Sequence, residues 1–149
     1  MALHLARAGR LRALAEVRGW LREAGFIKIN RFYCQDCGRL LARRGGLRYI
    51  KVSPAPAAGD VLVVVFGDGN GHCMVVEDIL SRTPEEISLR IADSTRFPHR
   101  NDTRAEGQTG IGSGEIRLLG AGGKYDVYDA QNPGLPPRKA EIYFLRFPG

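Results

Sequence analysis

The sequence predicts one α+β domain, residues 1–149, in which N-terminal helices pack on an antiparallel β-sheet. Apolar residues recur at helical spacing early in the chain and follow strand patterns after residue 60, and no segment repeats. Of the 149 residues, 44% are apolar and 26% are charged, which is an ordinary globular composition. A chain of this length buries enough surface to fold as one domain.

Two helices are expected in the N-terminal part. In residues 11–24, apolar side chains fall on one face of a helix and arginines lie between them. The second helix, residues 36–44, begins at Asp36, a favoured N-cap residue type, and ends at a pair of glycines. Cys37 is therefore expected in the first turn of this second helix.

A sheet of about residues 60–147 follows a link rich in proline and alanine. Short runs with strand-like patterns, bounded by turn residues, predict its strands. These runs are residues 60–66, 73–80, 87–93, 115–119, 125–128 and 142–147. The polar, glycine-containing segment 96–114 is expected to form a long loop, where functional residues often lie.

The net charge of +6 and the pI of about 9.6 predict attraction to anionic polymers, including nucleic acid and anionic cell-wall polymer. Charge alone does not choose among these partners. No run of 18 apolar residues is present, so no membrane span is expected, and the first residues lack the apolar stretch of a secretory signal. We therefore expect a soluble chain, cytoplasmic as given or exported by another route.

The three cysteines are expected to be thiols with chemistry rather than a disulfide framework, because their number is odd and the domain is large enough without one. Cys37 is the candidate nucleophile, since the unpaired N–H groups and the dipole at a helix start favour a thiolate. The neighbouring Asp36 opposes that ionisation, so a histidine partner is needed.

His72 is the expected base. It lies at the entry of a strand in which Met74 and Val76 share its face, while Asp93 ends an otherwise apolar row on the next strand. If the two strands pair as a hairpin centred on residues 82–83, His72 lies directly opposite Asp93. The carboxylate then holds one ring nitrogen while the other faces the thiol.

Three short motifs follow one another along the chain. They are Asp36-Cys37-Gly38-Arg39-Leu40, Gly59-Asp60-Val61-Leu62-Val63 and Gly71-His72-Cys73-Met74-Val75-Val76. In sequence and in order they resemble motifs of the NlpC/P60 and CHAP group of papain-like cysteine peptidases and amidases, and the resemblance spans roughly residues 20–94.

The resemblance implies a papain-like core and cleavage of an amide through a thioester, commonly in cell-wall peptides. Cys37 would attack the carbonyl carbon, His72 would carry the proton, and Asp93 would orient the imidazole. Tyr33 and Gln35 are both available to stabilise the oxyanion, and the sequence does not choose between them. We expect no metal or other cofactor.

The long loop adds His99, Asp102 and Arg104 just beyond Asp93. These side chains are candidates to line the substrate cleft, with Arg104 pairing with a substrate carboxylate. A loop that only satisfies its own hydrogen bonds is the alternative.

Other interpretations of these residues remain open. Cys34, Cys37 and His72, with Cys73, are ligand types for zinc, although neighbouring strand residues point to opposite faces. The Cys-x-x-Cys pair can also be a redox pair, but no strong strand precedes it. A further alternative is a noncatalytic basic module on the same fold that binds nucleic acid or another polyanion, including an inactive descendant of the hydrolases. Nucleic acid is not the expected partner, because no recognisable nucleic-acid-binding motif is present.

Overall fold

The computed structural model describes residues 51–146, which lie within one compact unit of the chain. The two helices expected at residues 11–24 and 36–44 lie outside the described residues. So do four residues that the sequence places at the site, which are Tyr33, Cys34, Gln35 and Cys37.

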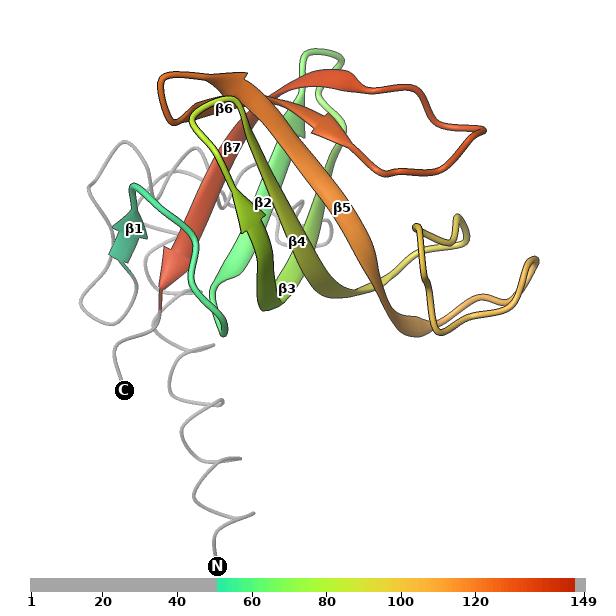
Figure 1. The fold of residues 1–149 in the computed structure, drawn as a ribbon. Helices are drawn as coiled ribbons and strands as arrows, with labels where there is room; N and C mark the ends of the chain where they lie inside the picture. The colour runs from blue at the N-terminus through green and yellow to red at the C-terminus, as the bar shows by residue number, and fades with distance from the viewer. Residues whose placement is uncertain (1–50, 147–149) are drawn as a thin grey trace, which may run out of the picture. The chain divides into compact units, whose positions relative to one another are not determined.

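All regular structure in residues 51–146 is β-strand. Every strand predicted from the sequence is present, and a short strand precedes them (Figure 1). The strands are β1 (Lys51–Ser53), β2 (Val61–Phe66), β3 (Gly71–Arg82), β4 (Glu86–Ser94), β5 (Ile111–Ala121), β6 (Lys124–Asp129) and β7 (Arg138–Arg146). Because β5 begins at Ile111, the end of the predicted long loop belongs to a strand.

The strands form one antiparallel sheet in the order β1-β7-β2-β3-β4-β5-β6, and β6 also pairs with β7. This last pairing closes β2 to β7 into a six-stranded barrel, with β1 added beside β7. One end of the barrel is formed where β2, β4 and β6 end and where β3, β5 and β7 begin. This end is called the site end below.

The prediction of an α+β, papain-like core with N-terminal helices packed on an antiparallel sheet is corrected by this closure. Within the described residues the fold is a closed antiparallel barrel without a helix. The physical reason is that the inward side chains of the strands pack against one another across the barrel. Closure also pairs the two strands that would otherwise be the free edges.

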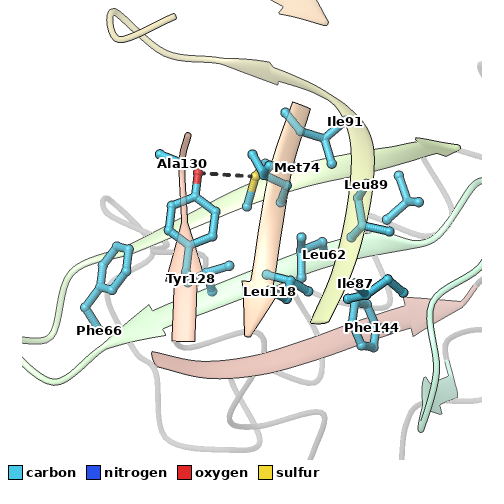
Figure 2. Packing of buried hydrophobic residues seen from close by; sticks show 13 residues of the cluster. Leu62, Phe66, Met74, Ile87, Leu89, Ile91, Leu118, Tyr128, Ala130 and Phe144 are labelled. Carbon is cyan, nitrogen blue, oxygen red and sulfur yellow. Dashed lines mark hydrogen bonds between the residues drawn. The ribbon is translucent and has the colours of Figure 1, made fainter. Parts of the chain in front are cut away.

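The barrel interior is filled by alternate residues of the strands (Figure 2). On β4, Ile87, Leu89 and Ile91 are each 0% exposed, as their alternation with polar residues predicts. Leu62 of β2 and Leu118 of β5 reach the same core. The apolar interior makes the polar groups at the site end notable, since each of them needs a partner.

Two bulges in β3 set its register with β4. Val76 pairs with Ile91 and Asp78 with Arg90, so Glu77 is an extra residue, and Leu80 is extra in the same way. The two bulges together move the pairing by two residues, which preserves the face that each inward residue occupies. A single bulge would reverse that face.

Among residues 51–146 we find no helix with the length and the apolar character needed to cross a membrane.

Candidate functional site

His72 and Asp93 meet at the site end. His72 is the second residue of β3, and Asp93 is the last inward residue of β4. The Nε2 atom of His72 lies 2.5 Å from the Oδ2 atom of Asp93. The carboxylate is fully buried, while the imidazole keeps 28% of its surface exposed. The imidazole is therefore accessible from outside, and the carboxylate that it contacts is not.

The contact forms although the register expected from the sequence was wrong. Val75 pairs with Ala92 and Val76 with Ile91, so Asp93 lies diagonally from His72 rather than directly opposite. Both side chains are nevertheless on the inward face, and a diagonal pair is within reach of a long side chain. The shared face, rather than exact opposition, brings the two residues together.

Two further cationic side chains hold Asp93. The Nη2 atom of Arg104 donates to Oδ1 over 2.9 Å, and Nε2 of His99 lies 3.0 Å from Oδ2. Burial raises the pKa of the Asp93 carboxyl. The hydrogen bonds from His72 and His99 and the charges of both rings lower it by more, so the pKa lies well below its ordinary value. Asp93 is therefore an ionised carboxylate that can only accept hydrogen bonds.

His99 is a buried imidazolium in this arrangement. Its Nε2 faces the Asp93 carboxylate, and its Nδ1 lies 3.0 Å from the carbonyl oxygen of Ala130. Both partners accept only, so both ring nitrogens must carry a proton. Burial lowers the pKa of His99, but the hydrogen bonds to Asp93 and Ala130 and the charges of Asp93 and Asp102 outweigh it, so the pKa is raised.

Arg104 uses all five of its N–H donors within the protein. Besides Asp93, Nε and Nη2 bind the Asp102 carboxylate at 2.8 and 2.7 Å, and Nη1 binds the carbonyl oxygens of Thr95 and Gly110. Its side chain is 2% exposed. The hydrogen bonds that Asp102 accepts from the Arg104 side chain and from the backbone N–H groups of His99 and Arg104 outweigh burial and lower its pKa to about 2. Arg104 thus holds Asp93 directly, and Asp102 holds Arg104. A contact of either residue with a substrate stays a prediction.

Two glycines of β5 make room for these buried groups. Gly112 pairs with Asp93 and Gly114 with Ile91. A Cβ atom at Gly112 would lie 2.4 Å from the Nε atom of Arg104, and one at Gly114 would lie 2.7 Å from the Cβ atom of His99. The sequence Gly-x-Gly at the start of this strand is the signal for the buried network that the strand pattern alone did not identify.

The remaining thiol of the described part, Cys73, is half-buried and follows His72 in β3. Adjacent strand residues point to opposite faces, so its sulfur lies on the other side of the sheet from the His72 ring. Cys73 is therefore no partner for that imidazole.

Among the described residues, the side chain of His72 makes its hydrogen bond through Nε2. Because Asp93 is ionised, His72 donates from Nε2, and in the neutral ring Nδ1 then carries the lone pair. A base whose tautomer and orientation are fixed by a buried carboxylate is suited to accept a proton from a nucleophile.

The same residues also resemble a metal-ligand set. One ligand atom from each of His72, Asp93 and His99 lies within 4.8 Å of the others. Two imidazoles and a carboxylate suit divalent first-row metals. A metal would have to replace the Nε2 protons of both rings, and Arg104 on the same carboxylate disfavours a second cation.

Comparison of the chain with protein-family models, with curated proteins and with solved structures gave no match in any of the three. The resemblance to NlpC/P60 peptidases stays a prediction made from short motifs. What the site does must therefore be argued from its own chemistry.

Proposed function

We propose that this protein is a thiol hydrolase that cleaves an amide, with Cys37 as nucleophile, His72 as base and Asp93 as the group that orients His72. The observation that carries the proposal is the 2.5 Å contact between His72 and a fully buried carboxylate. Asp93 itself is held by Arg104 and by His99. A buried carboxylate that contacts an exposed imidazole is the arrangement that an orienting group has in nucleophile–base sites.

In the proposed reaction, Nδ1 of His72 accepts the proton of the Cys37 thiol, and the thiolate attacks the carbonyl carbon of the amide. The imidazolium then gives that proton to the leaving nitrogen as the carbon–nitrogen bond breaks, leaving a thioester. Water, deprotonated by His72, hydrolyses the thioester and restores the thiol. Tyr33 and Gln35 stay the proposed donors to the oxyanion, and cell-wall peptides are the substrates to test first.

The test is alkylation of each cysteine by iodoacetamide between pH 4 and pH 9, read separately by mass spectrometry in wild type, His72→Ala and Asp93→Asn. Cys37 is expected to react far below the ordinary thiol pKa of about 8.5 in the wild type. That reactivity should disappear in His72→Ala and weaken in Asp93→Asn, because the ring loses its fixed orientation. Cys73 is the internal control and should react alike in all three proteins.

An ordinary pH profile for Cys37 in the wild type would contradict the proposal. So would a low-pH profile that His72→Ala leaves unchanged, because the thiol would then be activated by something else. Circular dichroism of each variant separates a lost base from a lost fold.

A divalent metal site is the second candidate, favoured by the convergence of His72, Asp93 and His99. It predicts near-stoichiometric metal in protein purified without chelator, and loss of that metal in His99→Gln. A noncatalytic basic module instead predicts strongly salt-dependent binding of polyanions that Cys37→Ser leaves intact.

A further inference from the structure

A pocket of about 290 Å³ opens at the site end, beside the His72 imidazole. Its walls are largely apolar and come from Phe66, Phe97, Tyr128 and Leu135. Figure 2 shows Phe66 and Tyr128 at one side of the core, where their rings pack edge to face with centroids 5.9 Å apart. Apolar pockets beside a few polar groups, at the mouth of a barrel, are the usual sites for small ligands.

Arg138 is the group of the pocket wall that favours an anion. His72 and His99 also line the pocket, but both already contact the Asp93 carboxylate, and no aspartate or glutamate is among the described residues of the wall. Arg138 belongs to β7, and its guanidinium lies 4.0 Å from the centre of the Phe66 ring. The ring face stabilises the guanidinium from one side. A planar guanidinium can bind a carboxylate through two donors.

Asp68 partly balances this charge. Its Oδ2 atom accepts from Nη2 of Arg138 over 2.8 Å, but both side chains are nearly half exposed. An exposed ion pair of this kind is weak and exchanges readily with a competing carboxylate. Arg138 can therefore bind a ligand carboxylate without the cost of breaking a buried pair.

The size of the pocket limits what enters it. Its volume is at the small end of ligand sites, so it suits one side chain rather than an extended polymer. The ligand that fits these walls has a medium-sized apolar group for the ring-lined interior and a carboxylate for Arg138.

We propose that this pocket is the substrate subsite and that it selects an amide whose apolar residue carries a free carboxylate, as an N-acylated apolar amino acid does. This rests on the proposed function, because it places that unit beside the His72 base. Arg138 is the residue that determines specificity for the anion, and Phe66 and Leu135 are the residues that determine it for the apolar group.

The experiment measures binding without turnover. N-acetyl-L-leucine, N-acetyl-L-leucinamide and N-acetylglycine are titrated by calorimetry and by amide chemical shifts into Cys37→Ser, and into the same protein with Arg138→Gln. Arg90→Gln is the matched control, since Arg90 is similarly exposed and forms an ion pair with Glu115 at 3.0 Å on other strands. The full chain is used throughout.

N-acetyl-L-leucine should bind and should change the amide chemical shifts of residues that line the pocket. The uncharged amide and the glycine derivative should each bind about tenfold more weakly than N-acetyl-L-leucine. N-acetyl-L-leucine should also bind about tenfold more weakly to the Arg138→Gln protein. These are the losses expected for a charged hydrogen bond or a buried side chain. Arg90→Gln should leave the affinity unchanged.

Equal binding of the amide and the acid would overturn the inference, as would equal losses in Arg138→Gln and Arg90→Gln. Absence of binding by N-acetyl-L-leucine would also overturn it. Because Cys37 alkylation is not measured in this titration, each of these results leaves the thiol-hydrolase proposal standing with a different substrate. Conversely, an unreactive Cys37 leaves a carboxylate-binding pocket intact.

Discussion

The charge state of individual residues explains how the site is held. Asp93 and Asp102 are acceptors with lowered pKa values, and Arg104 and the His99 imidazolium are their donors. The two negative and two positive charges balance on four side chains that are each at most 3% exposed. His72 is the exposed member of the cluster, since its imidazole keeps 28% of its surface exposed.

We expect the contribution of the His99 side chain to stability to depend on pH. Its folded-state pKa is raised above the ordinary 6.5, so the charged ring stabilises the fold fully below pH 6.5 and loses that contribution as the pH rises through the raised value. His99→Gln should therefore cost about 2 kcal/mol near pH 5.5 and clearly less near pH 9. Urea unfolding of both proteins from pH 5 to pH 9 measures the difference.

A difference that stays constant across this range would show that the neutral ring contributes as much as the charged one.

The carboxyl of Asp102 has the opposite pH dependence. Its pKa of about 2 means that its stabilisation is complete above its ordinary value and is lost as the pH falls toward 2.

Strands β3 and β5 carry the features that shape the site. The two bulges of β3 return His72 to the inward face, and the glycines of β5 leave space for the side chains behind Asp93. Neither feature adds a functional group. Both decide whether the functional groups can approach one another.

We expect that adding one methyl group at Gly114 destabilises the fold. A Cβ atom there would lie 2.7 Å from the Cβ atom of His99 and 3.0 Å from Oδ2 of Asp102, so one of these buried groups would have to move. Gly114→Ala should lower the free energy of unfolding by about 1–3 kcal/mol. Chemical denaturation at pH 7 measures this change.

Gly67→Ala is the matched control, because its new methyl group meets nothing within 4 Å. It should change stability by no more than about 0.5 kcal/mol. Equal effects of the two substitutions would mean that the loss reflects glycine replacement in general rather than crowding of the network.

Closure of the barrel is a property of the whole described region (Figure 1). Between β4 and β5 the pairing runs from Glu86 with Leu119 to Ser94 with Ile111, whereas β6 and β7 pair only through Val127 with Lys139 and Tyr128 with Arg138. This short seam joins the strands that bring Arg138 and Ala130 to the site end.

The seam should therefore open before the rest of the barrel. We expect amides of residues 124–129 to exchange with deuterium at least about tenfold faster than amides of residues 86–94, because local opening needs fewer broken pairs than global unfolding. Hydrogen exchange followed by mass spectrometry at pH 7 tests this. Equal exchange in all strands would show instead that the barrel opens only as one unit.

The sequence by itself determined the strands and their inward faces, including the placement of His72 and Asp93 on one face. Local alternation carries that information, because a side chain's face depends only on its neighbours along the strand. Even an incorrect register did not separate the pair, since the true register preserves the face.

Only the tertiary structure decided the closed barrel, the bulges and the partners of Asp93. Closure depends on contact between β6 and β7 and on the pairing of β7 with β2, and β2 is distant along the chain. The segment between β4 and β5 was expected to be a long loop because it is polar and contains glycines. Its charged side chains become buried only when His99 and Arg104 meet Asp93. Such pairing is a property of three-dimensional proximity, which periodicity along one strand does not encode.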